Sequence, residues 1–258
     1  MTKPPRARVR QSFEQAAARY DTAADVQRLI CDAMADRLAA LAPPGWTPQR
    51  WLDAGCGTGY ALPLLQARYP QAQAFALDLA PAMLGQAGSQ WPRIAADIEH
   101  LPLRSASIDL YWSSLTVQWC ELSRVLTEAR RVLRPGGRLA VATLGDNTFH
   151  ELRAAFSSVD PHRHTIAFHN ADEIAAMAVA AGLGEHQHHR RAEIRYFSDL
   201  KSLLRSVKTV GANQLGQGRR TGLLSRHAFA RAEAAYESLR SPQGLPLTYD
   251  VIELHAQV

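Results

Sequence analysis

Three glycines at alternate positions follow an acidic residue near the end of the first fifth of the chain. Asp53 closes a short apolar run, and the turn after it carries Gly55, Gly57 and Gly59. Glycine adopts positive φ values readily and lets bare backbone approach a ligand closely. The stretch therefore predicts a strand-to-helix loop that contacts a ligand. The same glycines also occur in plain turns, so the motif alone leaves a purely structural role open.

Acidic residues also end the next two predicted strands. An apolar strand over 74–78 ends at Asp78, where a carboxylate can accept both hydrogen bonds from a ribose diol. A third short strand precedes Asp97, whose carboxylate can accept a hydrogen bond from an adenine amino group. Acids that close successive strands in this order are difficult to obtain by chance. The pattern indicates a nucleoside site built from several strand ends.

The acidic residue and glycines at 53–59, with Asp78, Pro81 and Met83 after them, resemble the motifs of the class I S-adenosylmethionine (SAM) methyltransferases. The resemblance implies an α/β, Rossmann-like fold with a mostly parallel seven-stranded sheet. It also implies SAM as the cofactor and S-adenosylhomocysteine as its product, with Asp53 holding the amino group of SAM. The residues that it assigns to the cofactor are Asp53, Gly55, Gly57, Gly59, Asp78, Leu79, Met83, Asp97, Ile98 and Ser113.

Short strands and helices alternate from residue 50 to residue 143, which predicts a parallel sheet with helices on both faces. Apolar residues at three- and four-residue steps predict helices over 12–41. Beyond the core we expect helices over 147–159, 172–181, 199–210 and 225–239, a strand over 186–196 and a closing strand over 245–256.

We expect one domain over residues 1–258, made of three parts. These are an N-terminal helical arm over 1–45, a SAM-binding core over 50–145 and a helical insertion over 198–240. In the superfamily the last two strands form an antiparallel pair with a short connection, whereas about fifty residues separate them here. We therefore expect the insertion near the acceptor site.

Composition sets further bounds on function. The chain has 258 residues, 47% of them hydrophobic, which is enough to bury one good core. No run approaches the roughly 18–20 apolar residues of a membrane helix, so we expect no membrane partner. The three cysteines are too widely spaced for a disulfide framework or a zinc site, and a reducing cytoplasm is expected. The histidines within 186–189 would alternate between two faces of a strand, so no metal site is predicted there.

The segment that follows the fourth strand bears on what is methylated. It lacks the Asn/Asp-Pro-Pro-Tyr/Phe turn typical of enzymes that methylate adenine or glutamine nitrogens, and it lacks acidic ligands for a catechol-type metal site. Its sequence over 114–120, Ser-Leu-Thr-Val-Gln-Trp-Cys, resembles the Asn-Leu-Ala-Val-Gln-Trp-Cys segment of the malonyl-acyl-carrier-protein O-methyltransferases of biotin synthesis.

This second resemblance covers nearly the whole chain. Other matching positions are Phe13, Arg19, Tyr20, Thr143, Leu144, Glu151, Leu152, Arg205, Lys208, Gly211, Ala212, Leu215 and 247–249. The sequence departs from the family at Ser114, where asparagine is common, and over 165–168. The net charge of +5 favours an anionic partner such as an acidic carrier protein, a small acid or a nucleic acid.

The resemblance implies methyl transfer to the free carboxylate of a malonyl group on acyl carrier protein, giving an ester that primes pimeloyl synthesis. Tyr20 would then be a lid residue over the cofactor, or else a core aromatic of the first helices. Gln118 and Trp119 would line the acceptor channel, or else pack a helix on the sheet. Arg205 and Lys208 would hold the malonyl carboxylate or meet the carrier, or else form a solvated helix face.

Two rival functions stay open at this point. One is a SAM-dependent methyltransferase of another small molecule or of RNA, which the positive charge favours. The other is a catalytically silent subunit that keeps the fold and only binds a partner. The intact glycine turn with Asp53 and Asp78 speaks against the silent subunit, and no nucleic-acid partner is expected under the leading hypothesis.

Overall fold

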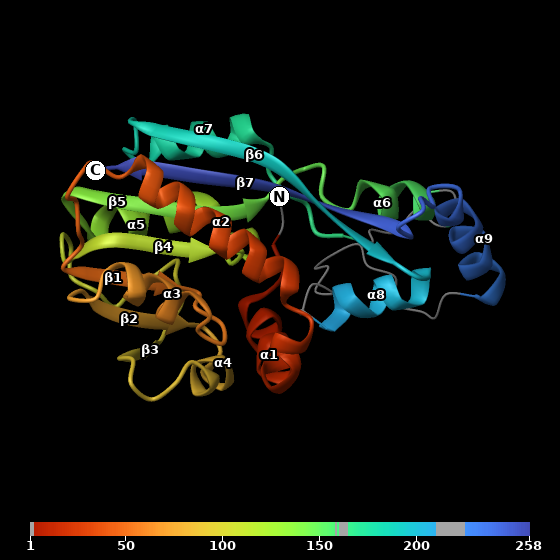
Figure 1. Ribbon diagram of the computed structural model, residues 1–258, viewed down its shortest axis with the longest axis horizontal. Coiled ribbons are helices and arrows are strands. Elements are labelled where there is room, and N and C mark those ends of the chain that lie inside the picture. The colour runs from red at the N-terminus through yellow and green to blue at the C-terminus, as the bar shows by residue number, and fades with distance from the viewer. Residues whose placement is uncertain (1–2, 158, 160–164, 210–224) are drawn as a thin grey trace.

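A computed structural model describes residues 3–157, 159, 165–209 and 225–258. Its described residues form a seven-stranded sheet in the order β3-β2-β1-β4-β5-β7-β6 (Figure 1). The strands β1 to β5 pair in parallel, and β7 is antiparallel to both β5 and β6. Their bounds are β1 (Arg50–Ala54), β2 (Gln73–Asp78), β3 (Arg93–Ala95), β4 (Ile108–Ser114), β5 (Leu133–Leu144), β6 (His186–Phe197) and β7 (Leu245–Gln257).

The central strands are apolar because helices cover both faces of the sheet. Trp51, Leu52, Leu110, Tyr111 and Trp112 of β1 and β4 are fully buried. Helices α2 (Asp25–Leu41) and α3 (Ala61–Arg68) lie on one face, and α5 (Leu122–Val132) and α7 (Ala171–Ala180) lie on the other (Figure 1). The predicted Rossmann-like α/β fold is therefore confirmed.

The strand order reverses between β1 and β4. From β1 the chain continues outward through β2 and β3, whereas β4 and β5 lie on the other side of β1. In open α/β sheets, ligands bind outside the carboxyl ends of the strands at such a reversal. Helix α1 (Arg6–Ala16) lies across these strand ends (Figure 1).

The N-terminal arm consists of α1, the 3₁₀ helix η1 (Ala17–Thr22) and α2. Its first helix begins at Arg6, six residues before the predicted start at residue 12. Within 6–12 only Val9 is buried, so this segment has no apolar periodicity that could reveal a helix. The prediction of the helix start was wrong for that reason.

The second half of the chain contains shorter helices than predicted. Helix α6 (His150–Ser157) begins three residues after the predicted position, because Phe149 has a φ of 57° and the backbone N–H of Asn147 donates to the Asp250 carboxylate. The remaining helical elements are α4 (Pro81–Gln86), η2 (Val117–Trp119), α8 (Leu200–Thr209) and α9 (Arg226–Glu237).

Two of the predicted features lie wholly or partly beyond the described part of the chain. The motif positions at Gly211, Ala212 and Leu215 are outside the described residues, as is the middle of the predicted insertion over 198–240. In the described ranges, no helix is both long enough and apolar enough to cross a membrane.

Candidate active site

In the loop after β1, Gly55 and Gly57 are needed for different reasons. At Gly55 φ is +82°, and an added Cβ would lie 2.2 Å from Cγ2 of Thr116. The Thr116 hydroxyl donates to the Gly55 carbonyl at 3.0 Å, which ties the loops after β1 and β4 together. At Gly57 φ is +55° and no heavy atom lies within 4 Å of an added Cβ, so here the backbone borders open space.

Two buried carboxylates lie beside this loop. Asp53 is 2% exposed, and its Oδ2 atom has no hydrogen-bond partner among the described residues. Burial, with a smaller contribution from the charge of Asp78, raises the pKa of Asp53 to about 8. Asp78 accepts hydrogen bonds from the backbone N–H groups of Gly57 at 2.9 Å and Ala80 at 2.8 Å, although burial still raises its pKa. A buried carboxylate without a partner fits a cationic ligand group such as the ammonium of SAM.

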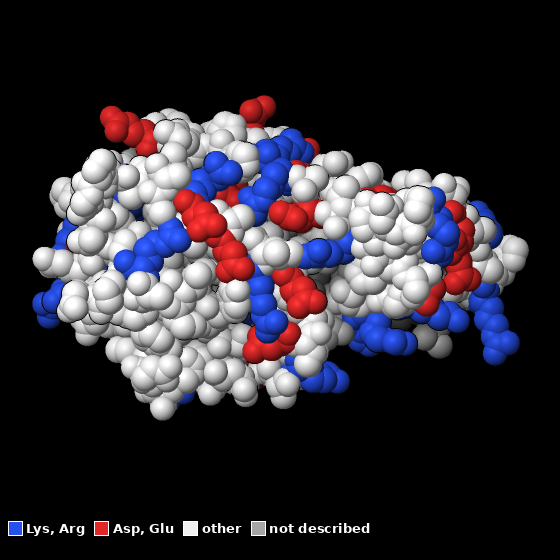
Figure 2. Space-filling view, in the orientation of Figure 1, with Lys and Arg blue, Asp and Glu red and all other residues white. Residues whose placement is uncertain are grey.

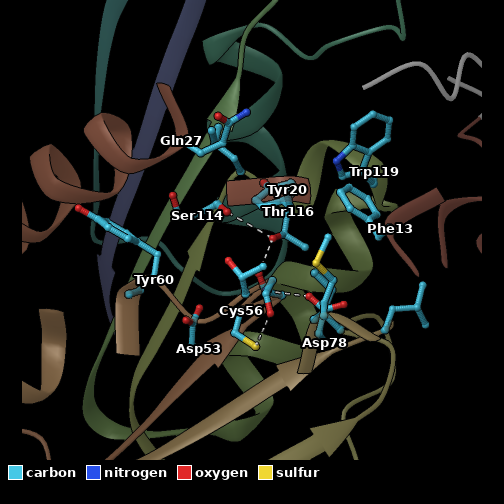
Figure 3. A pocket seen from close by; sticks show the side chains of 18 of the residues that line it. Phe13, Tyr20, Gln27, Asp53, Cys56, Tyr60, Asp78, Ser114, Thr116 and Trp119 are labelled. Atoms are coloured by element: carbon cyan, nitrogen blue, oxygen red, sulfur yellow. Dashed lines mark hydrogen bonds between the residues drawn. The ribbon is translucent and has the colours of Figure 1, made fainter. Parts of the chain in front are cut away.

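A first cavity opens above these carboxylates, between the strand ends and the N-terminal arm (Figure 3). The predicted cofactor residues that line it are Asp53, Gly55, Gly57, Asp78, Leu79, Met83, Asp97 and Ile98. From the arm it is lined by Arg6, Val9, Phe13, Tyr20, Asp21, Ala24, Gln27, Arg28 and Cys31. The structure thus brings together acids and glycines that the sequence spreads over more than forty residues.

Two predicted cofactor residues do not line the first cavity. An added Cβ at Gly59 would lie 2.8 Å from Cβ of Ala87, so Gly59 permits close packing of the chain. Ser113 is fully buried, and its hydroxyl donates to the Ala54 carbonyl at 2.6 Å, which joins β4 to the end of β1. Ser114 lines the cavity in place of Ser113.

Asp97 is held from two sides. Its Oδ1 atom accepts the backbone N–H of Glu99 at 3.0 Å, and its Oδ2 atom lies 3.1 Å from Nε of Arg6. Arg6 was missed from the sequence because the residues around it carry no pattern that places them at the site.

A second cavity adjoins the first. Its lining consists of Phe13, Tyr20, Gln27, Leu115, Gln118, Trp119, Leu144, Phe149, Thr165, Ile166, Phe168, Val207 and Tyr249. Five of these residues, Phe13, Tyr20, Gln27, Leu115 and Trp119, also line the first cavity. We call these five residues the shared wall. No Lys or Arg is among the described residues that line the second cavity.

Tyr20 lies in the shared wall beside two other aromatic side chains (Figure 3). The Phe13 ring is 6.4 Å from the Tyr20 ring and 5.9 Å from the Trp119 ring, the latter edge to face. Burial, followed by the charges of Asp78 and Asp21, raises the pKa of the Tyr20 phenol. The phenol therefore keeps its proton at neutral pH and can donate a hydrogen bond.

The loop between β4 and η2 shapes the second cavity. Leu115 has a φ of 53°, an uncommon value for a residue other than glycine. Its carbonyl accepts a hydrogen bond from Nε2 of Gln118 at 2.6 Å, whereas Oε1 of Gln118 is buried without a partner among the described residues. Gln118 therefore keeps one acceptor available inside the second cavity.

The two predicted acceptor-binding cations lie outside both cavities. Arg205 is exposed on α8 and lines an open groove with Arg195, Thr22, Ala23, Asp25 and Val26. Lys208 is exposed on the same helix. Arg195 of β6 was missed from the sequence. Its Nε atom is buried without a hydrogen-bond partner among the described residues, and its charge acts on Tyr249 of the second cavity. Across the described ranges, no three His, Cys, Asp or Glu side chains group as metal ligands.

Comparison with other proteins agrees with this geometry. Residues 52–141 match a family model described as a methyltransferase domain. The YcgJ protein of Bacillus subtilis aligns with a TM-score of 0.59 and 16% identity over 87% of this chain and 97% of its own. Geranyl diphosphate C-methyltransferase of Streptomyces coelicolor, solved with S-adenosylhomocysteine, aligns with a TM-score of 0.52 and 15% identity over 88% of this chain and 79% of its own. Fold and site define a class I SAM-dependent methyltransferase.

Relatives at higher identity narrow the class to one family. The malonyl-[acyl-carrier protein] O-methyltransferase of Dechloromonas aromatica is 56% identical over 99% of this chain and 96% of its own length. The protein of that name from Laribacter hongkongensis is 42% identical over 97% of this chain and 89% of its own. The chain belongs to the malonyl-[acyl-carrier protein] O-methyltransferase family, which confirms the resemblance found in the sequence.

Proposed function

We propose that this protein transfers the methyl group of SAM to the free carboxylate of a malonyl thioester on acyl carrier protein. The products are the methyl ester, which primes pimeloyl synthesis for biotin, and S-adenosylhomocysteine. The observation that carries the proposal is the shared wall, because its residues border both a cavity suited to SAM and an adjoining cavity that can take the acceptor. The relative in Teredinibacter turnerae is a bifunctional protein of biotin biosynthesis, 34% identical over 96% of this chain and 46% of its own length.

The proposed reaction does not require a general acid or a general base. A malonyl carboxylate is already ionised at neutral pH, so no general base is needed. One carboxylate oxygen attacks the methyl carbon in line, the carbon–sulfur bond breaks, and its electron pair stays on sulfur. The positive and negative charges cancel as the new bond forms, so a site that excludes water favours the reaction. The largely apolar lining of the second cavity supports this proposal.

Tyr20 and Gln118 then orient the acceptor. The protonated phenol of Tyr20 can donate to one carboxylate oxygen and leave the other for attack. The Gln118 Oε1 atom, buried and without a partner among the described residues, can accept from an N–H of the thioester arm. Positioning of this kind supplies on the order of 7–11 kcal/mol in well-oriented intramolecular reactions.

We propose that the acceptor reaches the second cavity along the open groove, because residues that line the groove are adjacent in sequence to residues that line the cavity, as Val26 is to Gln27 and Ser206 is to Val207. Arg195 and Arg205 line that groove, and Lys and Arg atoms gather along the lower edge of the region formed by α8 and α9 (Figure 2). We therefore assign Arg205, Lys208 and Arg195 to the phosphate of the carrier's prosthetic arm or to the acidic carrier surface. This modifies the sequence-based hypothesis, in which Arg205 and Lys208 could also have held the malonyl carboxylate.

We also propose a cytoplasmic location and a single domain. Cys31, Cys56 and Cys120 are all free and buried, which fits a reducing compartment. The N-terminal arm supplies one side of both cavities, so the arm and the sheet belong to one functional unit.

Intact-protein mass spectrometry tests the proposed reaction. Malonyl carrier protein incubated with SAM and the enzyme should gain one methyl group, and cleavage of the thioester should release that methyl group together with the malonyl group. Acetyl carrier protein is the matched control, because it has the same thioester arm without a free carboxylate. Equal methylation of both carriers would contradict the proposal.

The rival acceptors are tested in the same reaction. Free RNA in place of the carrier should accept no methyl group. Methylation of RNA that falls steeply with added salt would favour the nucleic-acid alternative. Failure to bind SAM in a calorimeter would favour a silent subunit.

A further inference from the structure

Arg6 lies at the start of α1, the helix that lines the first cavity through Arg6, Val9 and Phe13 and reaches the second cavity at Phe13. Its Nε atom lies 3.1 Å from Oδ2 of Asp97, and its Nη2 atom forms an ion pair with Glu99. Its Nη1 atom donates to the carbonyl of Trp119 at 2.9 Å and lies 3.5 Å from Sγ of Cys120. One guanidinium therefore contacts the acid assigned to adenine and the backbone of the shared wall.

The apolar contact between the arm and the body at this point is small. Ala16 and Ala17 of the arm pack on Ala80 and Met83 beside α4, with Phe13 and Tyr20 partly buried around them. Burial of a few small side chains contributes little, since the hydrophobic effect scales with the apolar area removed from water. Val9 of α1 is buried in the main core, and the charged contacts of Arg6 add to this contact in keeping α1 over the first cavity.

We infer that Arg6 is a positioning residue that holds Asp97 for the adenine amino group and thereby links the N-terminal arm to cofactor binding. The inference rests on the proposed placement of adenine at Asp97. The Glu99 N–H fixes one carboxylate oxygen and Arg6 fixes the other. Each oxygen can accept a further hydrogen bond, so the amino group of adenine can bind without displacing Arg6.

The ion pair with Glu99 explains why the guanidinium stays in place. Glu99 is 7% exposed, and a buried carboxylate needs a positive partner. A planar guanidinium can contact Asp97, Glu99 and the Trp119 carbonyl at once, whereas the ammonium of lysine is a single point charge. Lys3 adds a second link, because its Nζ donates to the Gln118 carbonyl at 3.1 Å.

The test compares two ligands that differ at one group of the base. The first is S-adenosylhomocysteine, and the second is its analogue with a carbonyl oxygen in place of the exocyclic amino group. Calorimetry should show the wild-type enzyme binding the first ligand at least about tenfold more tightly, as expected for one lost hydrogen bond to a charged group. In Arg6→Ala this preference should shrink at least threefold, and Arg6→Lys should be intermediate.

Arg10→Ala is the matched control on the same helix. Among the described residues Arg10 pairs only with Glu14, on the exposed surface at 2.8 Å, so the control should keep the wild-type preference. The double variant Arg6→Ala with Glu99→Gln removes the uncompensated buried charge. It should be measured alongside in case the single variant does not fold.

The outcomes separate the inference from the proposed function. A wild-type enzyme that binds both ligands equally would overturn the placement of adenine at Asp97, and with it the inference. A clear wild-type preference that stays unchanged in Arg6→Ala and in the double variant would overturn the role of Arg6 alone. A merely structural role for Arg6 would weaken both ligands by the same factor and leave the preference intact.

Discussion

At the scale of single residues, the site depends on a carboxylate that is unfavourable in the empty protein. Asp53 is buried, and its Oδ2 atom has no partner among the described residues. An isolated buried charge costs several kcal/mol unless it is neutralised or paired with an opposite charge. For this reason the pKa of a fully buried carboxyl group can rise by up to about 3–5 units. Because its pKa is raised to about 8, the Asp53 carboxyl group is mostly protonated at neutral pH, and it ionises when a cationic group binds beside it.

The first prediction concerns the pH dependence of SAM binding. Since the pKa of Asp53 is about 8 in the unliganded protein, binding below that pH must expel its proton. Affinity should therefore rise as pH increases toward 8, by up to about tenfold per unit. Above that pH the amino group of the ligand loses its own proton and affinity should level off or fall. Titration calorimetry across this range measures the effect.

Asp53→Asn is the control for this pH dependence. The variant has no proton to release, so its weak residual affinity should not rise with pH. Calorimetry of the wild type at pH 7 in two buffers of different ionisation enthalpy should also reveal proton release. Identical heats in both buffers would count against a protonated Asp53.

The second prediction concerns the hydroxyl of Tyr20. Tyr20→Phe keeps the ring beside Phe13 and removes only the hydrogen-bond donor at the shared wall. We expect kcat to fall about 10- to 100-fold, because a hydrogen bond to a charged group such as the acceptor carboxylate contributes roughly 1.5–3 kcal/mol. The Kd for SAM should change no more than about fivefold, because one neutral hydrogen bond contributes only ~1 kcal/mol. An unchanged kcat would remove the hydroxyl from the reaction.

At the scale of secondary-structure elements, the loops after β1 and β4 act as one unit. Gly55 and Thr116 are in direct contact, and Leu115 turns the second loop with a positive φ. The loop that contacts the cofactor and the loop that leads to the acceptor cavity are therefore joined by a direct contact. A change that separates these loops should affect both ligands.

The third prediction tests that contact. Gly55→Ala should weaken SAM binding at least tenfold and lower the melting temperature, because the new Cβ would overlap Thr116 and φ is positive at this position. The control is Gly85→Ala in α4, where no heavy atom lies within 4 Å of an added Cβ and helix propensity improves. Differential scanning fluorimetry with and without SAM measures both. Equal behaviour of the two variants would show that the overlap is relieved without consequence.

The fourth prediction concerns the groove between η1, β6 and α8. Arg205→Ala and Arg195→Ala should raise KM for malonyl carrier protein at least about fivefold and leave the Kd for SAM within about twofold, since neither residue lines the first cavity. Lys201→Ala, also exposed on α8, is the control. Steady-state kinetics at two salt concentrations should show that added salt reduces the difference. Parallel losses of SAM and carrier affinity would argue against this groove as the carrier's route.

At the scale of the whole molecule, the parts predictable from sequence are those set by local pattern. Apolar runs ending in Asp53 and Asp78 gave the strands and the acids at their ends, because both follow from short stretches of chain. The sequence predicted Ser113 as a cofactor residue, whereas the neighbouring Ser114 lines the first cavity and Ser113 bonds to the backbone of β1. Side chains alternate between the two faces of a strand, so which of the two serines faces the cavity depends on where β4 ends.

The parts that could not be predicted depend on how distant segments pack. Arg6 reaches Asp97 and Trp119 only because α1 lies across the strand ends, and Arg195 reaches the groove only through the antiparallel pairing of β6 with β7. Neither arginine stands in a periodic or motif-like context. Their roles depend on tertiary contacts, and the spacing of residues in a single sequence does not reveal such contacts.

The most direct test of the account is the crystal structure of the enzyme with S-adenosylhomocysteine and a malonyl-pantetheine analogue. The account predicts the homocysteine sulfur in the first cavity, facing Tyr20, and the malonyl carboxylate in the adjoining second cavity, with one carboxylate oxygen directed at that sulfur beside the shared wall. A carboxylate bound instead at Arg195 or Arg205 in the outer groove, with the second cavity filled by protein side chains, would contradict it.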